Sequence, residues 1–198
     1  NIINTDSFYN MMMYYIQYST SRGIQKETVS LLTICCNLCL SHHQYHLFTS
    51  HNYQLLYQMI QLFCTSSYDI QYDLCYIIYT FLSMEMINNQ HQMKNTIIHL
   101  LLTNHQIMEK IITLMKAPDI DLLYYTLHIL YYYIEHDLTN KSIIIKKIQQ
   151  IEEYDGILVL EQYALSSTNE TIYQLAQYIL DKYYGEDSIY YQTDDDDE

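Results

Sequence analysis

The sequence predicts an all-α protein built as a helical-repeat solenoid. The chain of 198 residues contains one proline and three glycines, so it is poor in the residues that the tight turns of a β-sandwich or an α/β domain require. Segments of similar pattern recur about 50 residues apart. Apolar side chains also recur at helical spacing over long stretches. Together these observations predict long helices joined by short polar loops.

The recurring segment is a polar, often acidic turn followed by an isoleucine and a long amphipathic helix. The four isoleucines are Ile24, Ile70, Ile120 and Ile172, which are spaced by 46, 50 and 52 residues. Armadillo and HEAT units run roughly 40–47 residues. The spacing therefore fits full-size units of this kind with loop insertions.

Apolar stripes in two of these helices support this interpretation. One stripe consists of Ile70, Leu74, Ile77, Ile78 and Phe81, and the other of Leu123, Leu127, Leu130 and Ile134. A helix with a single apolar face cannot bury that face alone. Stacked units would bury these faces in a continuous core.

Further helices are expected before each of these four. Apolar helices are predicted at 8–18, 53–64, 106–115 and 156–163, and shorter ones at 43–49, 90–102 and 141–151. Three helices per unit is the armadillo arrangement, whereas HEAT units have two. Pro118 stands just before Ile120, where it ends one helix and opens the next at low cost.

We therefore predict an armadillo-repeat right-handed superhelix of about four repeats. The repeats are placed at about 1–40, 41–87, 88–138 and 139–187, and an acidic, flexible tail is expected at 188–198.

The charge of the chain favours basic partners. The formal net charge is −14, and the tail at 194–198 supplies five of the 23 acidic residues, so the body still carries 9 − 18 = −9. Because duplex binding requires the opposite sign, nucleic acid is disfavoured as a partner, whereas basic proteins would be attracted. The alternative is that the acidity only keeps a chain rich in tyrosine and isoleucine soluble.

The five cysteines do not form a disulfide framework. They are Cys35, Cys36, Cys39, Cys64 and Cys75, and all lie among apolar residues in helical patterns. Free cysteine in such positions behaves as a small apolar residue. A reducing compartment, cytosol or nucleus, is therefore expected.

The sequence contains no motif that predicts catalysis, a cofactor or a metal site. His42 and His46 have a spacing that suits two metal ligands, but no third and fourth ligand follow. The three glycines are isolated, so they form no phosphate-binding loop. No signal peptide is visible at the start, and the apolar run at 122–134 is too short to span a membrane. We expect a protein without enzymatic activity and without membrane contact.

Several stretches resemble the C-terminal armadillo repeats of importin-α (karyopherin-α). Ile24-Gln25-Lys26-Glu27 resembles the start of a third helix in that family. The segments 151–157, 168–176 and 183–187 are similar to its last repeat, which often precedes an acidic tail. The resemblance covers about residues 7–187 and is most specific in the last repeat. It implies the seventh to tenth repeats of the family.

The resemblance also implies a peptide-binding groove along the third helices, where the family uses tryptophan and asparagine side chains. The tryptophan positions are Ser30 and Tyr76 here, the asparagine positions are Ile34 and Thr80, the carboxylates are Glu27 and Asp73, and Thr33 replaces a serine. The chain contains no tryptophan. Because Ile34 cannot clamp a peptide backbone through its side chain, we expect weakened or altered peptide binding.

The function implied by the resemblance is that of a nuclear import adaptor. Such an adaptor binds basic nuclear-localisation peptides of cargo proteins and shuttles between cytoplasm and nucleus. Its import partner, an importin-β-type receptor, would bind a segment expected before this chain. Its export receptor and nucleoporins would bind the last repeat, unless Gly156, Ile172 and Ala176 match only because that repeat must fold. The alternative is a repurposed armadillo scaffold that has lost signal-peptide recognition.

Overall fold

The computed structural model describes residues 5–42, 46–84, 90–136, 140–185 and 188. All regular elements within these ranges are α-helices, which confirms the predicted all-α class. The chain divides into two compact units, which we call unit 1 (Asn1–Thr103) and unit 2 (Asn104–Glu198). The boundary between them falls inside the third predicted repeat, 88–138. In the described part, no helix is both long enough and apolar enough to cross a membrane.

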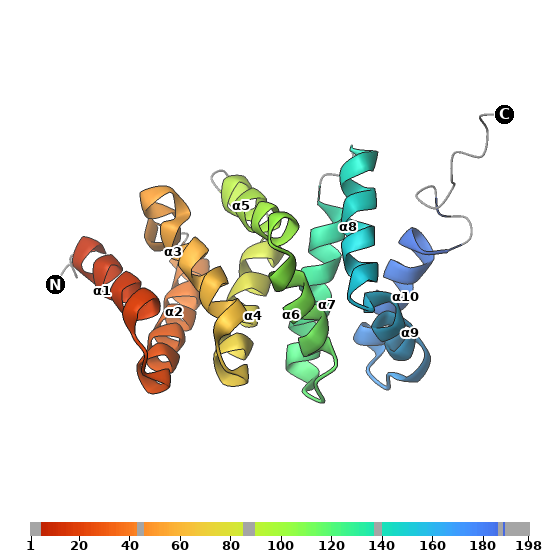
Figure 1. Cartoon of the computed structure of the whole chain (residues 1–198), viewed down its shortest axis with the longest axis horizontal. Coiled ribbons are helices and arrows are strands. Elements are labelled where there is room, and N and C mark those ends of the chain that lie inside the picture. Colours follow the sequence, from red (N-terminus) through yellow and green to blue (C-terminus); the bar gives the residue numbers. More distant parts are fainter. Residues whose placement is uncertain (1–4, 43–45, 85–89, 137–139, 186–187, 189–198) are drawn as a thin grey trace. The chain divides into compact units, whose positions relative to one another are not determined.

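Unit 1 contains two helix pairs that pack against each other (Figure 1). Its helices are α1 (Thr5–Tyr18), α2 (Arg22–His42), α3 (His46–Thr65), α4 (Tyr68–Ser83) and α5 (Gln90–Thr103). The pairs are α1 with α2 and α3 with α4. They meet through contacts of α1 with α3 and of α2 with α4. Helix α5 packs against α3 and α4. The predicted helices 8–18 and 90–102 correspond to α1 and α5.

The core of unit 1 lies between these pairs. The five apolar residues of the predicted stripe on α4, from Ile70 to Phe81, are all at most 2% exposed. The ring of Phe81 meets the ring of Phe48 from α3 edge to face, with centroids 4.7 Å apart. The helical spacing therefore identified the buried face of α4 correctly.

Helix α3 differs from the prediction of two separate helices at 43–49 and 53–64. It runs from His46 to Thr65, and three consecutive residues inside it, His51, Asn52 and Tyr53, have φ angles of 50°, 55° and 63°. This left-handed turn stands where the sequence pattern suggested a break, although none of the three residues is glycine. The ring of Tyr9 from α1 stacks on His51, with centroids 4.5 Å apart. Residues 43–45 of the first predicted helix lie outside the described residues.

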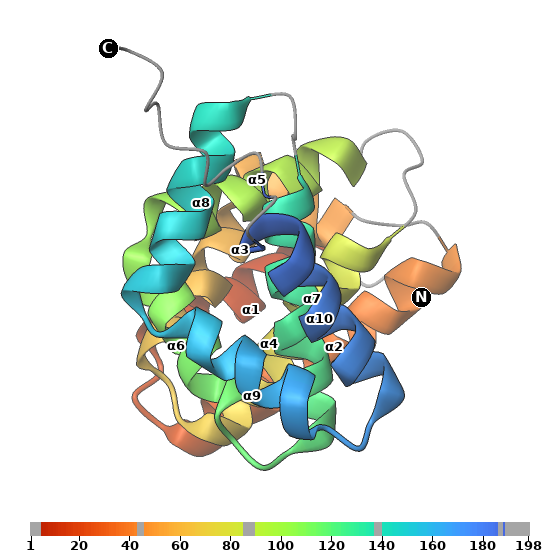
Figure 2. The same ribbon diagram turned by 90° about the vertical axis from the view of Figure 1, so that its right-hand side faces the viewer.

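Unit 2 also contains two helix pairs, joined here by a bridging helix (Figure 2). Its helices are α6 (His105–Met115), α7 (Ile120–Glu135), α8 (Lys141–Glu153), α9 (Gly156–Ser166) and α10 (Glu170–Tyr183). The pairs are α6 with α7 and α9 with α10, while α7 packs against α10 and α6 against α9. Helix α8 contacts α6, α7 and α9. The predicted stripe on α7, from Leu123 to Ile134, is at most 4% exposed.

Polar caps explain where four helices of unit 2 begin. The side chains of Asn104, Asp119, Asn140 and Asn169 accept backbone N–H groups at the starts of α6, α7, α8 and α10. These bonds satisfy donors that have no partner within the helix. Pro118 directly precedes the cap of α7, as the turn at 117–120 predicted.

The four isoleucines of the recurring segment are not equally buried. Ile70 and Ile172 are 0% and 1% exposed, whereas Ile24 and Ile120 are 44% and 51% exposed. The same sequence position therefore faces the core in α4 and α10 and faces solvent in α2 and α7. The sequence pattern around a single residue does not show whether a neighbouring helix covers that residue.

The flexible tail predicted at 188–198 does not begin at residue 188, because Ser188 lies within the fold. Ser188 is 4% exposed, its amide donates to the carbonyl of Gly185, and its hydroxyl donates to the carbonyl of Tyr183. Ser188 therefore belongs to the folded end of unit 2. The rest of the predicted tail, 189–198, lies outside the described residues, as do the predicted repeat boundaries near 87 and 138.

Gly156 is required by close packing at the start of α9. A Cβ at this position would lie 2.5 Å from Cγ2 of Ile151 and 2.7 Å from its carbonyl oxygen. Replacing Gly156 with alanine is therefore expected to destabilise unit 2 by about 1–3 kcal/mol, because the start of α9 must shift. Thermal and urea unfolding would measure the change.

The matched control for this prediction is Gly23→Ala in α2. A Cβ at Gly23 would find nothing nearer than the Ser21 hydroxyl at 3.9 Å, so this change should be neutral or stabilising by up to about 1 kcal/mol. Equal effects of the two substitutions would show that the close contacts at Gly156 do not affect the free energy of unfolding.

Candidate functional site

The residues predicted to line a peptide groove lie on α2 and α4, which pack together in unit 1. Glu27, Ser30, Thr33 and Ile34 stand on α2, whereas Asp73, Tyr76 and Thr80 stand on α4. Their surroundings differ strongly. Glu27 is exposed and Ile34 is 55% exposed, but Thr80 is only 4% exposed and offers little surface to a ligand.

The carboxylate of Asp73 is already bound to a lysine of the same chain. Lys26 Nζ on α2 lies 2.6 Å from Asp73 Oδ2 and also donates to the carbonyl of Asp69 at 2.7 Å. The Ser30 hydroxyl donates to the same Asp73 oxygen at 3.2 Å. The side chain of Asp73 is only 18% exposed. Its charge is therefore balanced within the fold.

A second ion pair lies one helical turn away at the same interface. Arg22 NH2 is 3.1 Å from Asp69 Oδ1, and the hydroxyl of Ser67 donates to that oxygen at 2.6 Å. The hydrogen bond from Ser67, together with Arg22, lowers the pKa of Asp69 to about 2, although desolvation of the carboxyl opposes this shift. Two cations of α2 are thus paired with two carboxylates of α4.

Two further polar residues of the predicted groove, Tyr76 and Thr33, also form hydrogen bonds within unit 1. The hydroxyl of Tyr76 donates to Asn37 Oδ1 on α2 at 2.6 Å, and the hydroxyl of Thr33 donates to the carbonyl of Val29 at 3.1 Å. Tyr76 therefore joins α4 to α2. We call the contacts of Arg22, Lys26, Ser30 and Asn37 with Asp69, Asp73 and Tyr76 the α2–α4 ladder.

No functional role was predicted for Lys26 or Asn37 from the sequence. For Lys26, however, the sequence does contain a signal. Lys26 and Asp73 are 47 residues apart, close to the repeat spacing of 46 between Ile24 and Ile70. Neighbouring repeats place residues about one period apart at their interface. Opposite charges separated by one period are therefore candidates for pairing between repeats.

Unit 2 contains a comparable cluster between α7 and α10. Glu135 Oε1 accepts hydrogen bonds from Lys182 Nζ at 2.6 Å, from the Tyr183 hydroxyl at 2.7 Å and from the Tyr178 hydroxyl at 2.8 Å. Lys182 Nζ also lies 5.1 Å from the ring centroids of both tyrosines, within range of cation–π attraction. Glu135 and Lys182 are again 47 residues apart.

The electrostatics of this cluster follow from its contacts. Burial alone would raise the pKa of Glu135, but hydrogen bonds from Lys182, Tyr183 and Tyr178 together hold it below its ordinary value. Burial would likewise lower the pKa of Lys182, but the hydrogen bonds to the same groups raise it above its usual range. Both groups are therefore charged over the physiological pH range.

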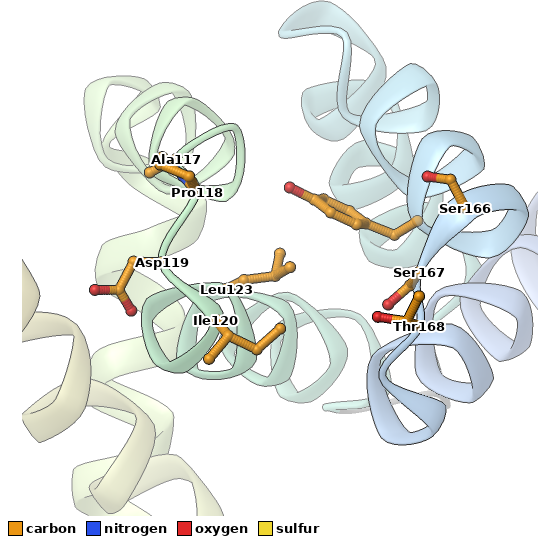
Figure 3. Close-up of a pocket in the computed structure, with 9 residues that line it drawn as sticks. Ala117, Pro118, Asp119, Ile120, Leu123, Ser166, Ser167 and Thr168 are labelled. Atoms are coloured by element: carbon orange, nitrogen blue, oxygen red, sulfur yellow. The ribbon is translucent and has the colours of Figure 1, made fainter.

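A small pocket opens in unit 2 between the α6–α7 turn and the α9–α10 loop (Figure 3). Its volume is about 210 Å³. Ile120 and Leu123 lie across from Ser167 and Thr168, while the carboxylate of Asp119 points away from these side chains. Ligand pockets usually measure about 300–1,000 Å³. The space is thus smaller than a usual ligand pocket.

The cysteines and histidines weighed in the sequence as possible sites are described only where the structure describes their side chains. Cys36 and Cys75 are buried, and burial raises the pKa of the Cys75 thiol. Among the residues that the structure describes, no three His, Cys, Asp or Glu side chains are close enough together to hold a metal ion. The side chains of His42 and His46 lie outside the described residues.

Comparison with known proteins adds no family assignment. No protein-family model matches the chain, and no curated protein matches its sequence closely enough to be a relative.

Proposed function

We propose that the chain is an armadillo-type repeat array that acts as a protein-interaction scaffold without enzymatic activity. The array would be a right-handed superhelix of about four repeats. The helix pairs that pack on each other within each unit support this proposal. So do the polar pairs separated by nearly one repeat period, Lys26 with Asp73 and Glu135 with Lys182.

The α2–α4 surface of this scaffold does not serve as a high-affinity site for basic peptides. The observation that carries this conclusion is the contact of 2.6 Å between Lys26 and Asp73. An incoming lysine must displace Lys26 before it can reach the carboxylate, so it gains little net electrostatic energy. The exposed Ile34 offers no hydrogen bond to a peptide backbone either.

Removing Lys26 should make Asp73 available to a ligand. In a fluorescence-polarisation titration with a lysine-rich nuclear-localisation peptide, we expect the unchanged chain to bind more weakly than about 10 µM. The variant Lys26→Met should bind about threefold to fivefold more tightly, because it frees a partly buried carboxylate and keeps an aliphatic stem of similar length.

The control is Lys110→Met in unit 2, which makes the same change in net charge away from the ladder. It should leave the affinity close to that of the unchanged chain, apart from a small non-specific gain. Binding of the peptide to the unchanged chain below about 1 µM would contradict the proposal, as would equal gains in both variants.

A nuclear import adaptor of the importin-α type is the second candidate. Glu27 favours it, because this exposed carboxylate has no partner among the described residues and stands where the resemblance implies a peptide contact. Such an adaptor would shuttle between cytoplasm and nucleus. Pull-down with an importin-β-type receptor and with the export receptor tests this candidate. Retention of both receptors with tight peptide binding would replace the scaffold proposal.

A further inference from the structure

The pocket of unit 2 has walls from two successive helix pairs (Figure 3). One wall is the α6–α7 turn with the start of α7, and the other is the end of α9 with the loop that leads to α10. All the residues that line the pocket belong to unit 2 and are described by the structure. The shape of the pocket therefore depends on one compact unit only.

The volume of the pocket is sufficient for one aromatic ring. It measures about 210 Å³, whereas an engineered cavity of about 150 Å³ in another protein binds benzene. Larger organic ligands usually occupy pockets of about 300–1,000 Å³. The size of the space therefore selects a small group, such as one side chain, over a cofactor.

The wall of the pocket on α7 is apolar. Leu123 is 4% exposed, whereas Ile120 is 51% exposed and lies across from Thr168 (Figure 3). Pro118 and the half-buried Tyr163 also line the space. Aromatic rings attract one another beyond the area that they bury. The lining therefore favours an aromatic ligand, which would also cover part of the exposed surface of Ile120.

The opposite wall offers one side-chain hydroxyl for a hydrogen bond. The hydroxyls of Tyr163 and Ser166 donate to backbone carbonyls within unit 2, and the hydroxyl of Ser167 bonds to the backbone two residues later. The hydroxyl of Thr168 forms no hydrogen bond with the described residues. Its side chain points across the pocket toward Ile120 (Figure 3). A ring that carries a hydroxyl can therefore form a hydrogen bond here that benzene cannot form.

The charged residue of the lining does not face the ligand. The carboxylate of Asp119 points away from the other lining side chains (Figure 3). It accepts hydrogen bonds from the backbone amides of Asp121 and Leu122, both at 3.0 Å. A charged group inside the pocket would therefore lose its hydration without gaining a counter-ion, so the ligand that fits is neutral.

We propose that the pocket binds the side chain of a tyrosine that a partner protein supplies. The ring lies against Leu123 and Tyr163, and the phenol hydroxyl bonds with the hydroxyl of Thr168. A tyrosine side chain combines the apolar ring and the polar group that this lining requires. The inference rests on the proposed scaffold for one point only, which is that the ligand comes from another protein.

Charges beside the pocket indicate the kind of partner. Asp121 and Glu170 are exposed carboxylates that follow the two lining segments closely in the sequence, and Lys116 is an exposed cation directly before the first segment. With Asp119, three carboxylates stand against one lysine, so a tyrosine next to lysine or arginine is favoured. A second copy of this chain is disfavoured, because each copy carries a net charge of −14.

Phenol and benzene are the probes for the pocket itself, because they differ only by the hydroxyl group. In NMR titrations of the full chain, both should shift the methyl signals of Ile120 and Leu123, with dissociation constants in the millimolar range. Thr168→Val removes the hydroxyl and keeps the shape of the side chain. It should weaken phenol binding about threefold and leave benzene binding unchanged. The matched control is Thr171→Val, which changes an exposed threonine of α10 outside the lining and should alter neither affinity.

Three short peptides test the source of the ring. Acetyl-Lys-Tyr-Lys-amide should shift the same methyl signals as phenol, and Thr168→Val should weaken its binding by the same factor. Acetyl-Glu-Tyr-Glu-amide should bind about threefold more weakly at low salt, because its carboxylates meet carboxylates, and the difference should disappear at about 1 M salt. Acetyl-Lys-Ala-Lys-amide, which has no ring, should leave these methyl signals unchanged.

Three results would overturn the inference. They are methyl signals of Ile120 and Leu123 that neither probe shifts, equal losses of phenol binding in both valine variants, and equal binding of the alanine and tyrosine peptides. A dimer of the chain in sedimentation experiments that Thr168→Val weakens would overturn the choice of partner, because a second copy would then supply the ring. None of these results affects the proposed scaffold, which the titration of Lys26→Met tests separately. Failure of that titration would leave phenol binding at the pocket unchanged.

Discussion

Replacing Phe81 with alanine is expected to destabilise unit 1 by about 3–5 kcal/mol. The side chain is 2% exposed and contacts the ring of Phe48, which is fully buried. Truncation removes the apolar surface of a whole ring and leaves a cavity that α3 and α4 can fill only in part. It also removes the edge-to-face ring contact.

Unfolding by urea, followed by circular dichroism, would measure the loss, and hydrogen exchange would show whether it is confined to residues 5–103. The matched control in the same unit is Ile34→Ala, which removes an apolar side chain that is 55% exposed. This control should change stability by less than about 0.5–1 kcal/mol. Similar effects of the two variants would contradict the place of Phe81 in the core of unit 1.

Replacing Glu135 with alanine should destabilise unit 2 by about 2–3 kcal/mol. The change leaves Lys182 and the hydroxyls of Tyr178 and Tyr183 without their common acceptor. Breaking a fully buried ion pair costs about 3–5 kcal/mol. Because the side chains of Glu135 and Lys182 are 18% and 33% exposed, solvent screening reduces the expected cost. Urea unfolding with exchange protection in α7 and α10 would measure it.

The same carboxylate should make stability depend on acid pH. The pKa of Glu135 is lower in the folded chain than its ordinary value. Its contribution to stability is therefore complete above the unfolded pKa of about 4.3 and is lost as the pH falls through the folded value. Glu135→Gln, which cannot ionise, should be less stable than the unchanged chain at pH 7, and the difference should shrink as the pH falls below about 4.

Glu109→Gln is the control for both experiments, because Glu109 is an exposed carboxylate of α6 that forms no side-chain hydrogen bond or ion pair with the described residues. It should match the unchanged chain at every pH. A constant difference between Glu135→Gln and the unchanged chain from pH 7 to pH 3 would show that the charge of Glu135 does not contribute to stability.

The ion pairs of the two units bear on the proposed absence of high-affinity binding to basic peptides. Lys26 and Lys182 each bind a carboxylate on a facing helix, and Lys182 also lies against two tyrosine rings. These are the contacts that a basic peptide would otherwise make. The chain supplies the cations itself and uses them to join neighbouring helices, which leaves Glu27 as the exposed carboxylate among the predicted groove residues.

The sequence by itself determined the helical class and the buried faces of α4 and α7. The stripes from Ile70 to Phe81 and from Leu123 to Ile134 were predicted from spacing alone, because a helix places residues three and four apart on one face whatever it packs against. Caps such as Asp119 and Asn169 act on the helix that follows them directly, so local sequence also located the helix starts. The break predicted between 49 and 53 is wrong, because α3 continues from His46 to Thr65 through a left-handed turn at 51–53.

Only the tertiary structure decided which side chains are available for function. Ile24 and Ile70 share one sequence pattern, yet one is exposed and the other is buried, because burial depends on whether another helix covers the position. Glu27 and Asp73 were predicted as equivalent carboxylates, but a lysine from α2 reaches only Asp73. Such contacts join residues 47 positions apart, and periodicity within one helix carries no information about them. The helices therefore follow from local spacing, whereas the candidate site depends on contacts between helices that lie far apart in the sequence.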